Sequence, residues 1–274
     1  MIKKNSERML AALTWTAAVA TLGVLLYLIV FILIRGIPYL KPSLFSLTYT
    51  SDNVSLTPAL ISTIIITMLS LAIAVPLGIF AAIYLTEYAR RGSKAVTLVR
   101  KTTETLAGIP SIVYGLFGML FFVTTLGWGF SILAGAFTLA IMILPLIMRT
   151  AEEAILAVPD LWREGAFGLG AGRLRTVFLI VLPAATPGIL AGITLAVGRI
   201  VGETAALIYS AGTVPQIPAT LLQSARTLSV HMFALSSEGL HVDQGYATAV
   251  VLLMVVILIN AASAGIARSF GAKT

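Results

Sequence analysis

Two side chains of opposite charge, Arg199 and Glu203, interrupt a long apolar stretch of the sequence. Charged groups inside such a stretch are costly and are usually kept for a function. A spacing of four residues would place both on one face of a helix. A planar guanidinium can bond two oxygens of an oxyanion at once. The pair therefore predicts either an anion site, in which Glu203 keeps Arg199 from binding too tightly, or a buried structural ion pair.

A second candidate is Pro110-Ser111, inside the run Gly108-Ile109-Pro110-Ser111-Ile112-Val113-Tyr114-Gly115. Proline removes a backbone donor and disrupts a helix, and the Ser111 hydroxyl can help to satisfy the freed groups. A broken helix can aim its free backbone N–H groups at an anion. The alternative is a structural kink whose glycines allow close helix packing.

The third candidate is the segment 150–187, which is polar at intervals and contains Pro159 and Asp160, a pair suited to a helix start. Apolar and charged residues alternate in it, which predicts two short amphipathic helices joined by a sharp reversal at Gly168, Gly170 and Gly172. Three large apolar side chains would be exposed without a partner, Trp162, Phe167 and Leu169. Such a helix suits docking into a groove of another protein, or lying on the bilayer surface.

The elements that position these residues follow from composition. Apolar residues make 58% of the 274 residues and charged residues only 11%, and the mean hydropathy is +1.01. A cytosolic enzyme needs more polar surface than this, so an all-α, polytopic membrane protein is expected. Six mostly apolar stretches are long enough to cross a bilayer, with Gly127-Trp128-Gly129 joining two of them: 11–34, 59–86, 104–126, 131–149, 188–211 and 246–267.

The basic residues predict the orientation. If the N-terminus is inside, fourteen of the 18 Lys and Arg residues lie in inner segments, three lie in outer segments, and Arg199 lies within a span. This asymmetry predicts cytoplasmic N- and C-termini. It also accounts for the net charge of +7 without nucleic-acid binding. The predicted division is 1–58 (N-terminus, first span, outer loop), 59–267 (the domain with the other five spans) and 268–274 (cytoplasmic tail).

The sequence lacks the residues that several kinds of chemistry require. The sequence has no cysteine, and no G-x-x-x-x-G-K-[ST] phosphate loop. No nucleophile–base arrangement stands out either. We therefore expect a non-catalytic chain without a cofactor or metal, which does not itself hydrolyse ATP.

The segment 160–183 resembles the E-A-A-x₃-G-x₉-I-x-L-P signature of binding-protein-dependent ABC importer permeases. The signature falls on Glu164, Gly165 in place of the first Ala, Ala166, Gly170, Ile180, Leu182 and Pro183. The resemblance implies a type I permease fold in which this loop docks as a coupling helix on a cytoplasmic ATPase. The Ala-to-Gly departure lowers helix propensity by ~0.8–1.0 kcal/mol.

Three runs are similar to those of the phosphate-specific permeases: 108–115, the junction Met148-Arg149-Thr150-Ala151-Glu152-Glu153, and Arg199-Ile200-Val201-Gly202-Glu203-Thr204-Ala205. The last two resemble the PstA-type subunit more than the PstC-type. The resemblance implies a multi-pass protein of the cytoplasmic membrane that transports inorganic phosphate. It also implies a second permease (PstC-type), an ATP-binding subunit dimer (PstB-type) and an extracytoplasmic phosphate-binding protein (PstS-type).

In this interpretation Arg199, Glu203, Pro110 and Ser111 line the substrate path. Counted from residue 188, Arg199 would lie ~17 Å along its helix, near the middle of a ~30 Å core. Two alternatives remain open. One is a secondary anion transporter using Arg199 and Glu203, which has no use for the 164–183 signature. The other is an ABC permease for another tetrahedral oxyanion.

Overall fold

A computed structural model describes residues 2–90 and 92–271, and the regular structure in this part of the chain is helical throughout. Arg91 and residues 272–274, within the predicted tail, lie outside the described residues. The helices are α1 (Ile2–Gly36), α2 (Thr57–Ile83), α3 (Lys94–Ala107), α4 (Ser111–Gly118), α5 (Ile132–Leu156), α6 (Asp160–Gly168), α7 (Arg173–Thr176), α8 (Leu182–Val201), α9 (Ala205–Ser210), α10 (Leu228–Glu238) and α11 (Val242–Gly271). Short 3₁₀ turns are η1 (Ile37–Tyr39) and η2 (Pro42–Phe45), and π-helical turns are η3 (Tyr84–Tyr88), η4 (Met119–Thr125) and η5 (Val177–Val181).

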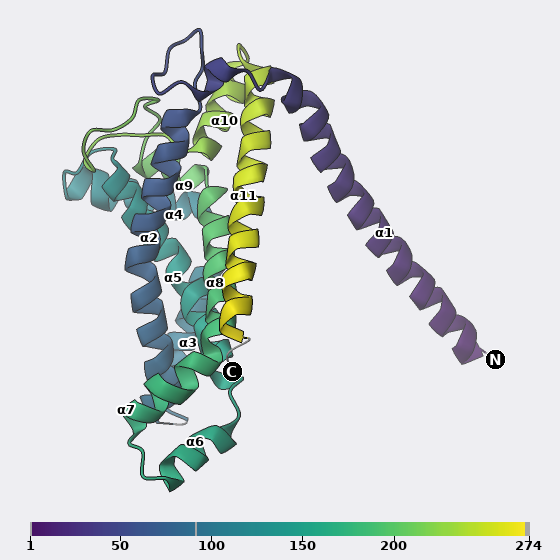
Figure 1. Cartoon of the computed structure of the whole chain (residues 1–274), viewed down its shortest axis with the longest axis vertical. Helices are drawn as coiled ribbons and strands as arrows, with labels where there is room; N and C mark the ends of the chain where they lie inside the picture. Colours follow the sequence, from purple (N-terminus) through teal and green to yellow (C-terminus); the bar gives the residue numbers. More distant parts are fainter. Residues whose placement is uncertain (1, 91, 272–274) are drawn as a thin grey trace.

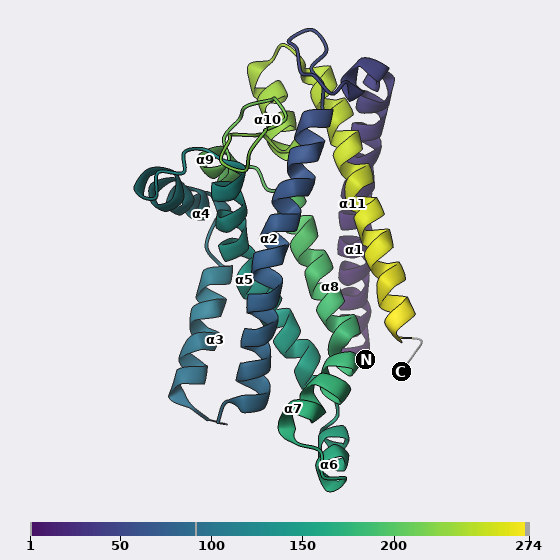
Figure 2. The same cartoon turned by 60° about the vertical axis from the view of Figure 1, so that its left-hand side comes forward.

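Helix α5 is the centre of the bundle. It packs against α2 and α8 along its length and against α4 and α9 near its start (Figure 2). Its buried face includes Leu139, Ile143 and Ile147, which belong to the main apolar core. Two-thirds of its most apolar window is buried, against about a quarter to a third for α2 and α11. Helix α5, which contacts many of the other elements, therefore carries residues of the 148–153 junction into the interior.

Five helices are long and apolar enough to cross a membrane: Met9–Tyr39, Thr57–Tyr88, Ile132–Leu156, Arg173–Val201 and Val242–Ser263. The third predicted span, 104–126, is not one straight helix. Its residues lie in α3 and α4–η4, which meet at an angle of 98°. The bend falls at Gly108–Pro110, where proline removes a donor and restricts the residue before it. A break at Pro110 is thereby confirmed, and the described residues contain six crossings when this bent pair is counted as one span.

The predicted bounds of the fifth span, 188–211, are wrong. The helix begins at Arg173 and continues through η5 and α8 to Val201. The predicted second amphipathic helix of the loop is therefore the first turn of this span. The span ends early because Gly202, Glu203 and Thr204 leave the helix before α9 begins. Arg199 lies ~39 Å along from Arg173 at 1.5 Å per residue, near the helix end and not at its middle.

The long helix α1 packs mainly on α11 and η1 near its own C-terminal end, and then diverges from the bundle (Figure 1). Its large apolar side chains are exposed, including Trp15 and Leu22. The predicted inner loops share one end of the bundle with α6 and α7, while η1, η2 and α10 lie at the opposite end. Helix α1 begins and α11 ends toward the α6 end. This arrangement agrees with the side assignment made from the basic residues.

Candidate functional site

The two motifs predicted for the substrate path pack directly on each other, α4 against α9. A Cβ added to Gly115 would lie 2.8 Å from the Cα of Ala206 and 3.2 Å from the carbonyl oxygen of Ala205. Only glycine permits so close an approach of two backbones. Gly118, one turn later, sits equally tightly on Thr138 of α5. The structural kink with close glycine packing, which the sequence offered as the alternative to an anion site, is present.

Tyr114 bridges the bend between α3 and α4. Its hydroxyl donates a hydrogen bond to the carbonyl of Leu106 at 2.8 Å, and its ring is buried. Leu106 is in the last turn of α3, where a carbonyl has no intrahelical partner. Pro110 itself is exposed, and Ser111 is half-buried without a described side-chain hydrogen bond. The Leu106 carbonyl is thus satisfied by the Tyr114 hydroxyl and by the Ile109 amide at 3.1 Å. Ser111, which the sequence had suggested for this role, makes no such bond in the part of the chain that is described.

Glu203 is buried in the gap between α8 and α9, with 9% of its surface exposed. Its carboxylate accepts a hydrogen bond from the backbone amide of Ala206 at 3.0 Å, which caps the first turn of α9. Its own carbonyl accepts a hydrogen bond from the Ser229 hydroxyl at 2.5 Å. The predicted shared helix face with Arg199 is wrong, because Glu203 lies beyond the end of α8.

Arg199 has no ionic partner in the part of the chain that the structure describes; the four described ion pairs do not include it. No side-chain hydrogen bond of Arg199 is described either, and the residue is half-buried. Its helix neighbours Ala196 and Ile200 belong to the same buried apolar cluster as Tyr114. Arg199, a cation without an ionic partner among the described residues, therefore belongs to a helix that packs in the same core as the bent third span.

The predicted coupling segment forms α6 and a tight reversal. Glu164 and Gly165 are exposed, whereas Ala166 faces inward with 6% of its surface exposed. Gly170 has a φ of +81°, a left-handed conformation that favours glycine. The amide of Gly170 donates to Phe167 at 2.9 Å, and that of Ala171 to Ala166 at 3.0 Å. This pair of bonds is the Schellman motif that closes a helix C-terminus, so the glycine of the signature has a defined backbone role.

The free face of α6 is apolar. Leu161 is 76% exposed, Trp162 47%, and Leu169, just after the helix, 92%. Large apolar groups so exposed next to one another mark an interaction surface. The predicted exposure of this face is confirmed.

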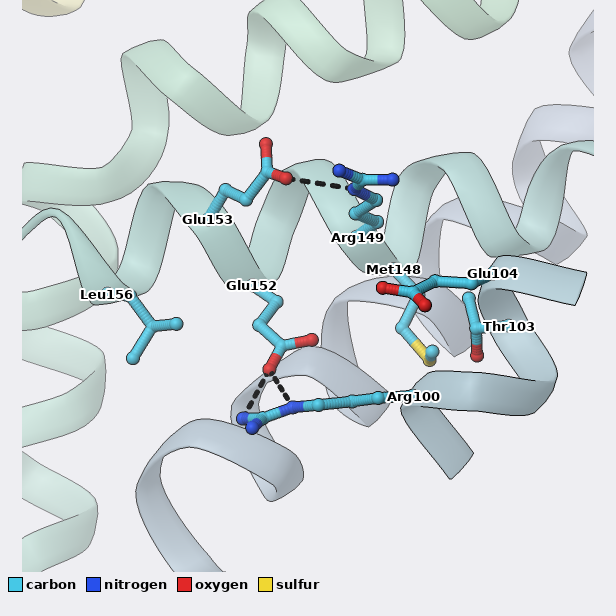
Figure 3. Close-up of a pocket in the computed structure, with 8 residues that line it drawn as sticks. All are labelled: Arg100, Thr103, Glu104, Met148, Arg149, Glu152, Glu153 and Leu156. Carbon is cyan, nitrogen blue, oxygen red and sulfur yellow. Dashed lines mark hydrogen bonds and ion pairs between the residues drawn. The ribbon is translucent and has the colours of Figure 1, made fainter. Parts of the chain in front are cut away.

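A charged pocket of about 260 Å³ lies between α3 and α5 at the end of the bundle that carries α6 (Figure 3). Arg100 donates from Nε to Glu152 at 2.7 Å, and its terminal nitrogen contacts the same oxygen at 2.5 Å. Arg149 pairs with Glu153, one turn away on α5, at 2.9 Å. Glu152 is nearly buried, so the Arg100 pair fixes α3 to α5 on the inner side.

Sequence reasoning missed two side chains that connect the predicted motifs to their neighbours, Tyr114 and Arg163. Tyr114 stood inside a quoted motif, but an aromatic residue in an apolar span carries no distinctive signal. Arg163 precedes the signature glutamate and makes a buried ion pair with Glu87 at 2.8 Å. Charged residues are common at the ends of spans, so nothing in the sequence singled out Arg163 and Glu87 as partners.

Comparison with known proteins places these features in a family. Residues 74–274 match the model of the family described as "Binding-protein-dependent transport system inner membrane component". A probable ABC transporter permease protein, YqgI of Bacillus subtilis, is 32% identical over 260 residues, covering 89% of this chain and 87% of that protein.

Two further relatives are phosphate transport system permease proteins by name. PstA of Haemophilus influenzae is 34% identical over 215 residues, covering 76% of this chain and 74% of that protein. PstA 1 of Mycobacterium tuberculosis (strain CDC 1551 / Oshkosh) is 35% identical over 209 residues, covering 75% and 68%.

Solved structures share the fold. An inward-facing MetNI methionine ABC transporter matches with a TM-score of 0.63 at 22% identity, over 78% of this chain and 93% of that chain. A bacterial alginate ABC transporter in complex with its periplasmic protein matches with a TM-score of 0.64 at 17% identity, over 93% and 94%. The fold is thus that of an ABC importer permease, and the chain is a multi-pass membrane protein. It belongs to the family of binding-protein-dependent transport system inner membrane components.

Proposed function

We propose that this chain is the PstA-type permease subunit of an ATP-driven importer of inorganic phosphate in the cytoplasmic membrane. Its relatives from Haemophilus influenzae and Mycobacterium tuberculosis that bear the name of phosphate permeases span three-quarters of the chain. That similarity, covering both motifs and the coupling loop, favours phosphate over other tetrahedral oxyanions. Its working partners would be a PstC-type permease, a pair of PstB-type ATPase subunits and a PstS-type phosphate-binding protein.

One observation carries the anion path through this chain: Arg199 is half-buried and has no ionic partner among the described residues. A guanidinium in a mostly apolar environment requires a polar cavity or a passing counter-ion. Phosphate can act as that counter-ion, because two of its oxygens accept hydrogen bonds from the guanidinium at once. Arg199 would bind the anion transiently, while Glu203 holds the turn at the start of α9 and keeps Arg199 at the path. Pro110 and Ser111 would contribute the broken helix next to it.

Coupling would run through α6. ATP binding closes the ATPase dimer and displaces α6, whose apolar face, containing Leu161 and Trp162, seats on the ATPase. Glu164, Gly165, Ala166 and Gly170 define the shape of that contact. The spans of the two permeases then exchange an inward opening for an outward one. Phosphate released by the binding protein would enter between them, and both chain ends would remain cytoplasmic.

A secondary anion transporter is the alternative that the charge pair alone permits. It would use Arg199 and Glu203 for ion coupling and would not need the exposed surface on α6. Uptake by such a protein would continue without ATP, which separates the two functions in a single assay.

The test uses the complete complex in proteoliposomes, with binding protein outside and ATP inside. Phosphate should stimulate both ATP hydrolysis and uptake, whereas sulfate and molybdate should stimulate neither; arsenate, a close mimic, reports on selectivity. Equal stimulation by sulfate or molybdate would overturn the assignment of phosphate. Uptake that persists without ATP would overturn the ATP-driven mechanism.

A further inference from the structure

The side chain of Arg163 connects three elements at the inner end of the bundle. It lies in the first turn of α6, but only 13% of its surface is exposed, because it points back toward the spans. Its Nε and one terminal nitrogen donate to the same oxygen of Glu87, at 3.0 and 2.8 Å. Glu87 lies in η3, the end of the second span, and is 9% exposed. This pair therefore joins α6 to the end of α2.

The remaining donors of Arg163 reach the end of α5. One terminal nitrogen donates to the carbonyl of Ile155 at 2.9 Å, and the other donates to the carbonyl of Val158 at 2.7 Å and to Asp160 at 3.2 Å. A guanidinium has five N–H groups, and this arrangement provides an acceptor for each. Carbonyls at a helix C-terminus lack partners and attract a positive charge. Arg163 supplies that charge at the end of α5.

Within residues 2–90 and 92–271, Asp160 is bonded to Arg163 itself, and no further side chain of α6 makes a described hydrogen bond. Glu164 is exposed, and the apolar residues on the free face of α6 point away from the bundle. Figure 1 shows α6 at the extreme end of the molecule, next to α7. A second contact nearby supports the same junction: Arg173, at the start of the fifth span, lies 5.6 Å from the ring of Tyr88 in η3.

We propose that Arg163, with Glu87 as its partner, is a positioning residue that makes α6 move as one body with the ends of α2 and α5. This rests on the proposed function, in which an ATPase displaces α6. A helix held only by its two flexible linkers could move without the spans. A helix held by two hydrogen bonds to Glu87 and one to the Ile155 carbonyl, with a further bond to the Val158 carbonyl just after α5, passes its displacement to both spans. Lysine offers three donors from a single point, so it cannot reproduce the contacts to Glu87 and to both carbonyls together.

The experiment measures uptake per ATP in the reconstituted complex. Arg163→Met should leave ATPase co-purification intact, because the apolar face of α6 is unchanged, yet lower phosphate uptake per ATP at least about tenfold. Glu87→Gln leaves the contacts of Arg163 with the Ile155 and Val158 carbonyls in place. In this variant and in Arg163→Lys, uptake per ATP should lie between the values of Arg163→Met and the wild type. Lys101→Met is the matched control, since Lys101 is an exposed cation of the inner side without a described partner; its uptake per ATP should be that of the wild type.

A rescue separates tethering from folding, because the chain has no native cysteine. The double variant Glu87→Cys/Arg163→Cys, in a complex whose other accessible cysteines are removed, should be uncoupled as isolated. A short cleavable thiol cross-linker should restore uptake per ATP, and its cleavage should abolish it again. Restoration by the linker has no explanation in a purely structural role.

Three results would overturn the role of Arg163: unchanged uptake per ATP in Arg163→Met, loss of ATPase binding at a normal membrane level, or a proportional fall of hydrolysis and uptake that the cross-linker leaves in place. Failure of the proposed function looks different. In that case the wild-type complex itself shows no phosphate-dependent uptake, before any variant is compared.

Discussion

The Glu203 carboxylate accepts a hydrogen bond from the Ala206 amide at 3.0 Å and so caps α9. This leaves Arg199 without an ionic partner in the described chain, and the two charges therefore have separate tasks. We expect Arg199→Met to abolish phosphate uptake at a normal membrane level, and Arg199→Lys to impair it, because an ammonium lacks the planar fork. Glu203→Gln retains a cap acceptor and should be milder than Glu203→Ala, which should cost about 1 kcal/mol or more.

The double variant Arg199→Met/Glu203→Gln distinguishes these tasks from a structural ion pair. Removing both members of such a pair restores much of the loss, whereas an anion-binding arginine stays lost. We expect normal assembly and no uptake from this variant. Substantial uptake at a matched membrane level would contradict the binding role of Arg199.

Gly115→Ala should destabilise the protein although alanine favours helices. The added Cβ would lie 2.8 Å from the Cα of Ala206, and backbone atoms yield less readily than a side-chain end. Such overpacking costs roughly 1–3 kcal/mol, more than the ~1 kcal/mol that the helix gains. Thermal unfolding in detergent should therefore occur at a lower temperature. Gly23→Ala in α1, with nothing within 4 Å, is the control; an equal effect of both changes would refute the close approach of α4 and α9.

Gly170→Val should release the ATPase while the permease stays in the membrane. The φ of +81° at Gly170 costs a non-glycine residue about 1–2 kcal/mol, and a β-branched side chain more, so the reversal after α6 would be reshaped. Gly168→Ala lies inside α6 in open space and should retain binding. Co-purification of the ATPase at matched permease levels measures both. Retained binding in Gly170→Val would show that the reversal is not needed for docking.

His231 should make the protein sensitive to acid. Burial first, and then the positive charge of Arg226, lower the pKa of the His231 imidazole from 6.5 to about 3, against an opposing effect of the Val54 backbone. Because the folded pKa lies below the unfolded one, the folded state binds fewer protons between these values. Its contribution is complete above about pH 6.5 and is lost as the pH falls, by ~2 kcal/mol at about pH 5.

The melting temperature in detergent should therefore fall between about pH 7.5 and about pH 5. His231→Phe, which keeps a ring against Tyr49, should flatten that dependence. His241→Phe should leave the dependence as it is, because His241 is half-exposed. A wild-type melting temperature that does not change over this range would contradict the burial of an uncharged His231.

The orientation can be tested with single cysteines, since the chain has none. Cysteines replacing Asn5 and Ala272 should resist an impermeant thiol reagent in intact cells, and one replacing Asp52 should react. The physical reason is the excess of Lys and Arg in the segments expected inside. Permeabilised cells give the control, in which all three should react. Labelling of either end in intact cells would invalidate the six-crossing topology.

Much of the architecture was readable from local sequence. Apolar runs predicted the spans because crossing a bilayer requires about 20 apolar residues in succession. The Pro110 break, the Gly127–Gly129 turn and the helix that starts at Asp160 are likewise confirmed. The glycines at 168, 170 and 172 predicted a sharp reversal, and Gly170 has the left-handed conformation that makes it, because only the local backbone conformation is needed to place such a turn. These features depend on neighbours a few residues apart.

Tertiary structure alone decided where the charges act. The fifth span ends at Val201 with the Glu203 carbonyl accepting from Ser229, 26 residues away, which no helical period reveals. Gly115 meets Ala206 only because α4 and α9 cross. Arg163 binds Glu87 across 76 residues. Residue type and period encode how a segment folds by itself, but which groups satisfy one another across segments depends on the path of the whole chain through space.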